Sequence, residues 1–223
     1  DAVVTGGSDV LARLTYGGFN SLRSVDPDPC RPFDRERRGL SIGEAAGILV
    51  FEEEEAARRR GATILGEFLG YGVTSDAFHM TAPDPSGAAG GRTIRAALEN
   101  AGLDAADVDY VNAHGTATPQ NDSAETAAIK SALGDRAKEI PVSSIKSMIG
   151  HCLCASGAIE AIATLMTVRH GLVPPTIHYE HPDPACDLDY VPNEARERPV
   201  RVALSNSFAF GGNSSVVVIG RHE

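Results

Sequence analysis

Extended apolar runs alternate with helical patterns along this chain, and this alternation most restricts the folds open to it. Strands are expected over residues 2–5, 46–51, 62–71, 108–113, 140–144, 200–205 and 215–219. Helices are expected over residues 91–100, 122–134 and 155–169, and a charged helix is expected between the second strand and Gly61. Strands that alternate with helices indicate an α/β fold. We expect the last two strands to be antiparallel neighbours joined by the turn at Phe210-Gly-Gly.

Local signals refine three places in this pattern. Asp122 is expected to cap the helix that starts there, with Glu125 three residues later as its capping-box partner. Residues 175–199 are rich in Pro, Asp and Arg, so we expect an ordered surface excursion. A weak seam near residues 70–72 predicts two units, residues 1–72 and residues 73–223.

Composition and charge restrict the partners of the chain. Its 223 residues are 42% hydrophobic, which is enough for a core, and the net charge is −10. An acidic surface argues against nucleic acid as the main partner. No apolar run reaches membrane-spanning length and the N-terminus lacks a signal-peptide pattern, so we expect no membrane partner and a cytoplasmic location. A start at Asp1, directly on a strand-like run, is typical of the middle of a longer chain.

The cysteines and arginines carry weaker signals. The four cysteines, Cys30, Cys152, Cys154 and Cys186, do not predict a disulfide framework in a chain this long and apolar. His151-Cys-Leu-Cys154 lacks the spacing and the second thiol pair of a zinc site. The arginine clusters at residues 31–38 and 58–60 fit either solvated faces or docking of an acidic partner.

Two histidines in glycine-flanked turns carry the chemical signal. His114 lies in Val-Asn-Ala-His-Gly-Thr-Ala-Thr-Pro, and His151 ends Ser-Ser-Ile-Lys-Ser-Met-Ile-Gly-His. Two neutral imidazoles can both donate hydrogen bonds to one carbonyl or carboxylate, which suits acyl chemistry. Lys146 follows an apolar strand, where a lysine acts either as a fixed, partly buried cation or as an ordinary surface charge. Each motif alone is a weak signal.

Taken together, the segments resemble the β-ketoacyl-acyl carrier protein synthases, in the branch with a Cys-His-His site. The resemblance covers essentially the whole chain, through Gly6-Gly-Ser-Asp9, Arg31-Pro-Phe-Asp34, Gly43-Glu-Ala-Ala-Gly47, Ser75-Asp-Ala-Phe-His-Met-Thr81, His114-Gly-Thr-Ala-Thr118, Asn121-Asp-Ser-Ala-Glu125, Lys146-Ser-Met-Ile-Gly-His151, Val173-Pro-Pro-Thr176 and Asn206-Ser-Phe-Ala-Phe-Gly-Gly212. It implies the thiolase-like layered αβαβα fold, with residues 1–72 as the end of the first half and residues 73–223 as the second.

The resemblance also implies a reaction and a catalytic set. The reaction is decarboxylative Claisen condensation in fatty acid or polyketide synthesis, in which malonyl on an acyl carrier protein extends an acyl group held on a cysteine. His114 and His151 would donate hydrogen bonds to the malonyl thioester carbonyl. Lys146 would position this pair, and Glu125 would anchor both the Lys146 region and the His114 loop. The Phe210 backbone N–H would form half of the oxyanion hole.

Further positions follow from the same resemblance. Thr116 and Thr118 would hold the pantetheine arm, and Phe208 and Phe210, with Gly211 and Gly212, would gate the acyl pocket. Arg23 would contact the acidic carrier protein. A structural monovalent cation would lie among Asn112, Glu160, Ser205 and Asn206, and no other cofactor is implied.

The nucleophilic cysteine of the family falls before Asp1, so it is not in this chain. We therefore expect a complementary N-terminal segment or chain that carries it, in a homodimer or a heteromer, and poor solubility without that complement. Cys154 is a remote substitute for the nucleophile. The alternatives are a non-catalytic partner like a chain-length factor, which would tend to lose the His-Lys-His set, a thiolase, which would carry a second cysteine where Phe210-Gly-Gly stands, and a binding module.

Overall fold

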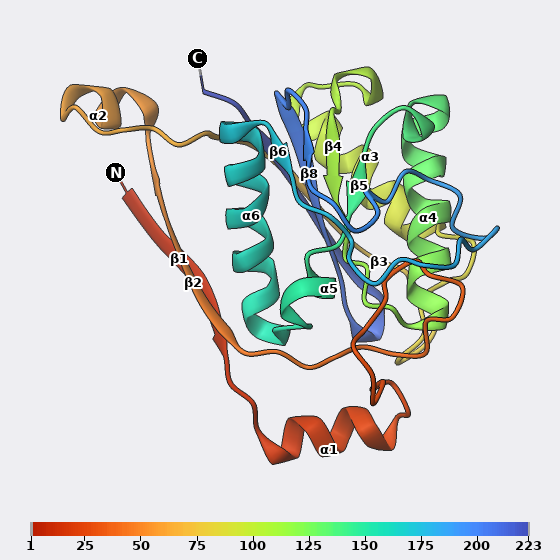
Figure 1. Cartoon of the computed structure of the whole chain (residues 1–223). Helices are drawn as coiled ribbons and strands as arrows, with labels where there is room; N and C mark the ends of the chain where they lie inside the picture. Colours follow the sequence, from red (N-terminus) through yellow and green to blue (C-terminus); the bar gives the residue numbers. More distant parts are fainter. Residues whose placement is uncertain (1, 223) are drawn as a thin grey trace.

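A five-stranded mixed sheet forms the centre of the molecule (Figure 1). The computed structural model describes residues 2–222. The strand order is β3 (Glu67–Ser75), β9 (Asn213–Gly220), β8 (Val202–Phe208), β4 (Tyr110–Asn112) and β5 (Val142–Ser143). The first three strands are antiparallel neighbours, whereas β4 runs parallel to both β8 and β5. The parallel strands end at the same edge of the sheet, so the loops that follow β4 and β5 lie side by side.

Helices cover both faces of this sheet. Helices α3 (Ala88–Ala101) and α4 (Pro119–Leu133) lie on one face, and α6 (Ser156–His170) lies on the other (Figure 1). The α3 residues Ile94, Ala97 and Leu98 follow helical spacing and are buried in the larger core cluster. A second cluster forms on the α6 side around Tyr110 and Val168. The α/β class expected from the alternating pattern is confirmed.

A separate two-stranded ribbon packs on the side of α6 away from the main sheet (Figure 1). Its strands β1 (Ala2–Asp9) and β2 (Ala45–Glu52) are antiparallel, and Ala2 pairs with Glu52. Gly47 faces α6 so closely that a Cβ there would lie 3.0 Å from the Ile159 side chain. The molecule is therefore layered as ribbon, helix, sheet and helix pair.

Short elements complete the chain. They are the helices α1 (Arg13–Ser21), α2 (Glu54–Arg59) and α5 (Lys146–Ile149), the paired strands β6 (Leu172–Val173) and β7 (Arg196–Glu197), and 3₁₀ turns at Ala105–Asp107, Gly134–Lys138, Leu153–Ala155 and Phe210–Gly212. Glu53 caps α2, because its carboxylate accepts from the backbone N–H groups of Glu55 and Ala56. Among the described residues, no helix is both long and apolar enough to cross a membrane.

The sequence patterns locate most of these elements. The antiparallel pairing of the last two strands is confirmed by β8 and β9. The third expected strand begins at Glu67, not at residue 62, and continues to Ser75, so the unit boundary expected at residue 72 falls inside β3. The glycines of that seam lie in close packing, and the division into two units stays a prediction. A Cβ on Gly72 would lie 2.3 Å from the Thr93 carbonyl oxygen of α3.

Two further expectations differ from the structure. The predicted Asp122 cap is wrong, because α4 begins at Pro119, whose ring presets the φ of a first helical position. Asp122 lies inside α4, and its carboxylate accepts hydrogen bonds from other loops. Residues 175–199 are ordered, as predicted, but they also bury Tyr190 and Cys186. The Val142 N–H donates to the Asp189 carbonyl oxygen at 2.8 Å, so this segment covers the β5 edge.

Candidate active site

The two histidines singled out by the sequence lie in edge contact. Their ring centroids are 5.3 Å apart and their planes are nearly perpendicular, at 86°. His114 follows β4, and His151 follows the short helix α5 that comes after β5. Because β4 and β5 are parallel neighbours, the segments after them converge at one edge, where α/β sheets place their sites.

The pair faces a cavity of about 490 Å³. The predicted substrate residues Thr116, Thr118, Phe208, Phe210 and Gly212 also line it. The Phe208 ring lies 5.9 Å from the His114 ring, centroid to centroid. The structure therefore brings together at one cavity both histidines, the two threonines and the aromatic pair that the sequence singled out.

Lys146 connects His114 to a buried carboxylate. Its ammonium group donates to the His114 carbonyl oxygen at 2.6 Å, lies 3.4 Å from His114 Nδ1, and pairs with the Glu160 carboxylate. The side chains of Lys146 and Glu160 are both 1% exposed. A buried ion pair of this kind fixes a charge in place, and removal of one partner is costly. Lys146 is thus a buried cation and not a surface lysine.

These contacts assign the tautomer of each histidine. An ammonium group only donates, so His114 Nδ1 accepts from Lys146 and the ring proton belongs on Nε2. His151 Nδ1 accepts from the Leu153 N–H at 3.2 Å and lies 2.9 Å from Ser156 Oγ, which places its proton on Nε2 as well. Each ring therefore offers an Nε2–H donor at the cavity.

The electrostatics keep both rings neutral. Burial lowers the pKa of His114 well below its usual value, and the nearby Lys146 charge lowers it further. Burial and Lys146 likewise lower the pKa of His151 to about 3. A neutral imidazole can donate one N–H without a change of protonation state at neutral pH.

Glu125 holds the backbone of the His114 loop. Its carboxylate accepts from the N–H groups of His114 and Gly115, each at 2.8 Å, and from Asn206 Nδ2 at 3.1 Å. Burial raises its pKa to about 7, although these three donors oppose the rise. The anchoring of the His114 loop agrees with the resemblance. The resemblance also implied that Glu125 anchors the Lys146 region. Among the described residues, however, the carboxylate paired with Lys146 belongs to Glu160, which comes from α6 on the opposite face of the sheet.

The turn between β8 and β9 approaches the cavity through two left-handed glycines. Gly211 has φ +78° and Gly212 has φ +76°, and a Cβ on Gly212 would lie 1.7 Å from Asp76 Oδ1. The side chain of Phe210 is 46% exposed and its ring lies 5.7 Å from Phe19. The oxyanion role of the Phe210 N–H stays a prediction.

The residues expected around a cation are adjacent and oxygen-rich. Asn112 pairs with Ser205 across β4 and β8, and Asn112 Nδ2 donates to the Glu160 carbonyl oxygen at 3.1 Å. Within the described residues, three buried oxygens have no hydrogen-bond partner: Asn112 Oδ1, Glu160 Oε2 and Asn206 Oδ1. Buried polar atoms are nearly always satisfied, and oxygen ligands suit a hard cation. The residues present therefore fit the implied ion.

The cysteines do not supply a reactive thiol. Cys154 lines the cavity, but the Asp9 carboxylate beside it raises the pKa of the thiol, which keeps it protonated. Burial raises the pKa of Cys30, Cys152 and Cys186. The remote possibility that Cys154 replaces the nucleophile finds no support in this setting.

Three other positions complete the comparison with the sequence. Arg23 is exposed at the surface with φ +54° and is absent from the residues that line the cavity. Ser156, as a partner of His151, and Glu160, as the partner of Lys146, are contacts that the sequence did not predict. Among the described residues, one group of metal-ligand side chains gathers, Glu54, Glu67 and His222, and none of the three lines the cavity.

Two family profiles match separate stretches of the chain, up to residue 180. The profile described as "Beta-ketoacyl synthase, C-terminal domain" matches residues 65–180, and "Beta-ketoacyl synthase, N-terminal domain" matches residues 1–57. A 3-oxoacyl-[acyl-carrier-protein] synthase 2 of Synechocystis is 50% identical over the full chain, and one of Staphylococcus aureus is 47% identical. In both cases the chain covers 55% of the relative, so it spans about half the length of the curated relatives it matches.

Ketosynthases are among the solved structures that match the fold of this chain. A type II PKS ketosynthase bound to its acyl-carrier protein and a hexaketide (AntDE:AntF) is 40% identical, with a TM-score of 0.98 over all of this chain and 57% of that one. A beta-ketoacyl synthase from Burkholderia phymatum is 40% identical, with a TM-score of 0.93 over all of this chain and 55% of that one. The expected thiolase-like fold is thereby confirmed.

Proposed function

The chain belongs to the beta-ketoacyl synthase family, and from that premise we propose that it supplies the decarboxylating half of a decarboxylative Claisen condensation. The substrates would be an acyl thioester and malonyl on an acyl carrier protein, in fatty acid or polyketide synthesis. One observation carries the proposal: two neutral histidines, each with an Nε2–H donor, meet at a cavity beside a buried lysine. A non-catalytic chain-length-factor-like role is not favoured, because the His-Lys-His set is complete.

The geometry supports a specific sequence of bond changes. The malonyl thioester carbonyl oxygen accepts from both Nε2–H groups. When the bond to the carboxylate breaks, carbon dioxide leaves and the electron pair passes into the thioester enolate. Preorganised donors to such an oxyanion contribute about 3 kcal/mol each. The enolate carbon then attacks the acyl carbonyl, and the cysteine thiolate leaves. The Phe210 N–H is proposed as a donor to the oxygen of that tetrahedral intermediate.

A groove beside the site is proposed to receive the missing cysteine. This groove of about 1050 Å³ lies between β1–β2 and β8–β9, and its apolar wall includes Val3, Ile48 and Leu165. Gly157 and Ser207 line both the groove and the histidine cavity. A complementary segment from outside these 223 residues that filled the groove would therefore reach the histidines, and we propose that it carries the thiol.

The remaining roles are proposed from the resemblance to the family. Thr116 and Thr118, whose hydroxyl oxygens are 2.9 Å apart, would bind the pantetheine arm. Phe208 and Phe210, together with the left-handed turn at Gly211 and Gly212, would gate the acyl pocket. Arg23 would contact the acidic carrier protein. A cytoplasmic location and a homodimeric or heteromeric assembly stay predictions.

A monovalent cation is proposed at the orphaned oxygens. Asn112, Ser205 and Asn206 would hold it together with Glu160, and it would fix the strand ends beneath the catalytic loops. We expect a higher melting temperature in potassium or sodium chloride than in choline chloride of equal ionic strength, because a ligand of the native state stabilises it. Equal melting temperatures in all three salts would count against the ion.

The first test of the proposed function combines composition with activity. Denaturing intact mass and peptide mapping of the purified protein identify every polypeptide in it, and an assay with acyl and malonyl carrier proteins follows 3-oxoacyl carrier formation. We expect a cysteine-bearing segment that matches the family's first half, and product in its presence. A lone species near 23.4 kDa that released no carbon dioxide from malonyl carrier would overturn the proposal.

A further inference from the structure

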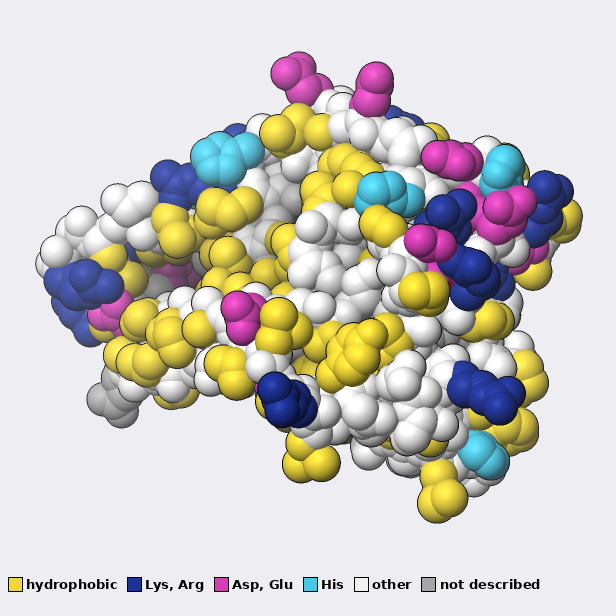
Figure 2. All heavy atoms as spheres, turned by 60° about the horizontal axis from the view of Figure 1, so that its bottom comes forward, with side chains coloured by type: hydrophobic (Ala, Val, Ile, Leu, Met, Phe, Trp, Pro, Cys, Tyr) yellow, Lys and Arg dark blue, Asp and Glu magenta, His cyan; other side chains and the backbone are white. Residues whose placement is uncertain are grey.

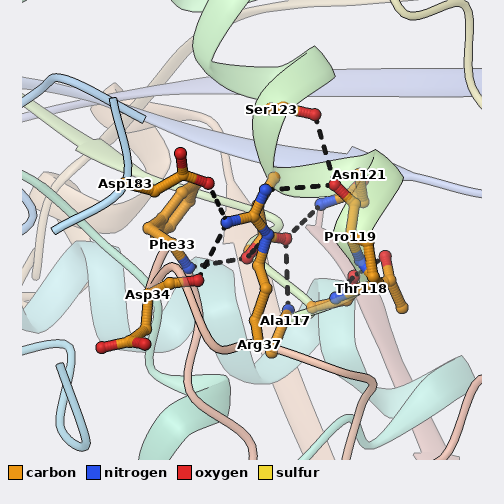
Figure 3. Close-up of polar contacts among 12 residues, drawn as sticks. Phe33, Asp34, Arg37, Ala117, Thr118, Pro119, Asn121, Ser123 and Asp183 are labelled. Carbon is orange, nitrogen blue, oxygen red and sulfur yellow. Dashed lines mark hydrogen bonds and ion pairs between the residues drawn. The ribbon is translucent and has the colours of Figure 1, made fainter. Parts of the chain in front are cut away.

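Arg37 is a buried guanidinium that joins three segments distant in sequence (Figure 3). Its side chain is 7% exposed. Nη1 donates to the Asp34 carbonyl oxygen at 2.9 Å and to Asp183 Oδ2 at 2.5 Å, and Nη2 donates to the Pro119 carbonyl oxygen at 3.1 Å. Nε lies 3.9 Å from Asp122 Oδ2. Arg37 has no role in substrate contact in the proposed reaction.

Asp122 forms an ion pair with Arg37 but no hydrogen bond to it, and it contacts two backbone positions. Its carboxylate is fully buried and accepts from the Phe33 N–H at 2.7 Å and from the Ala117 N–H at 3.1 Å. Phe33 has φ +64° and Ala117 has φ +65°, a left-handed conformation that side chains other than glycine rarely adopt. Such a backbone persists only where its surroundings hold it. Asp122 holds both residues at once.

Both held residues bear on the His114 loop. The Phe33 ring stacks on Tyr190, with centroids 4.0 Å apart, and a Cβ on Gly115 would lie 2.9 Å from Phe33 Cε2. Phe33 therefore packs directly against the residue after His114. Ala117 stands between the two threonines of the cavity. The Asp122 carboxylate thus holds both Phe33, which packs against the His114 loop, and Ala117, which belongs to that loop.

We propose that Arg37 is a positioning residue, which acts through Asp122, Phe33 and Ala117 to set the place of the His114 imidazole. This inference rests on the proposed function for its catalytic consequence but not for its structural one. Arginine suits the task because its planar fork donates to one carboxylate and two carbonyl oxygens while it forms an ion pair with a second carboxylate, which a lysine cannot reproduce. Removal of the guanidinium would also leave the Asp122 charge buried beside one fewer cation.

The test uses the protein as it is purified, with every polypeptide that accompanies this chain. Arg37→Met is compared with Arg37→Lys and with a matched control, Arg35→Met, which makes the same substitution two residues away at an exposed side chain. Amide hydrogen exchange and the ring signals of ¹³C-labelled histidine report on structure, and malonyl carrier decarboxylation reports on activity. Asp183→Asn removes one half-buried partner and serves as a milder variant if Arg37→Met does not fold.

We expect exchange at the Phe33 and Ala117 amides to become about tenfold faster in Arg37→Met, because local opening is then less costly. The His114 ring signal should shift, while the His151 signal, held by Leu153 and Ser156, should stay. The kcat for decarboxylation should fall about tenfold with a smaller change in KM, because misplacement of a donor costs transition-state stabilisation. Arg37→Lys should be intermediate, and Arg35→Met unchanged.

Two results would overturn the inference. One is unchanged Phe33 and Ala117 exchange together with an unchanged His114 signal in Arg37→Met. The other is a uniform acceleration that includes the Val111 and Leu204 amides of the core, which would indicate general destabilisation. If wild-type protein releases no carbon dioxide but the local exchange and the His114 signal change as expected, the proposed function fails while the positioning role stands.

Discussion

The strand-end site and the β1–β2 ribbon meet solvent in opposite ways. At the site, charged Lys146 and Glu160 are each 1% exposed and paired. On the ribbon, the apolar side chains of Val4 and Ile48 are 69% and 66% exposed. Figure 2 shows hydrophobic side chains gathered on this side of the molecule. A polar set is thus fully enclosed, while an apolar face of the same chain is uncovered.

This difference indicates which part of the chemistry the chain completes by itself. The donors and the cation of the histidine site are positioned by contacts within the described residues. The ribbon also borders a groove that leads to the same site, through Val3 and Ile48, and exposed apolar faces of this kind mark interaction surfaces. We therefore distinguish the proposed decarboxylation site, whose polar groups are positioned within the described residues, from the thiol, which we propose that a complementary segment supplies.

The largest expected effect comes from breaking the enclosed ion pair. Lys146→Met should lower the free energy of unfolding by about 3–5 kcal/mol, because it leaves the Glu160 carboxylate buried without its cation. The double variant Lys146→Met/Glu160→Gln should lose clearly less. Urea unfolding of the purified protein measures both. A single variant as stable as wild type would show that the pair is not enclosed in solution.

An effect of intermediate size is expected in the pH dependence of the free energy of unfolding, through the enclosed His151. The pKa of His151 is lowered to about 3 in the folded protein, so between pH 6.5 and 3 the unfolded chain binds a proton that the folded chain does not. Its contribution to stability is therefore lost as the pH falls below 6.5, by at most about 1.4 kcal/mol per pH unit. His151→Gln should flatten the stability curve in that window.

Glu125 changes stability in the opposite direction and provides an internal check. Its pKa is raised from 4.5 to about 7, so its contribution to stability is lost as the pH rises between these values. Stability should therefore fall more steeply towards acid in Glu125→Gln than in the wild type, and less steeply in His151→Gln. Parallel curves for wild type and both variants would mean that neither group is buried as described.

The smallest effect on folding is expected at the ribbon. Val4→Thr and Ile48→Thr should change the free energy of unfolding by no more than about 0.5 kcal/mol, because both side chains are already exposed. They should nevertheless reduce self-association of the chain without its complement and weaken binding of that complement. Sedimentation velocity measures self-association and binding. A loss of stability as large as that of Lys146→Met would show that the ribbon is covered within this chain.

Much of the fold was predictable because strands and helices carry their own periodicity. Both histidines come after expected strands, but only the structure shows that these strands are parallel and end at one edge, where the two rings meet. The partner of Lys146 was not predictable, since Glu125 and Glu160 are both acidic residues near the motifs and only the placement of α4 and α6 on opposite faces decides between them. The left-handed backbone at Phe33 and Ala117 was equally hidden, because neither is a glycine.

The most direct measurement of the central claim is carbon dioxide release from malonyl carrier protein with no acyl primer present. Decarboxylation then depends on the histidine donors and not on transfer of an acyl group. We expect release by wild-type protein and a fall of about 10²–10³-fold in His114→Ala and in His151→Ala, the loss typical for one oxyanion donor. Equal rates in wild type and both variants would contradict it.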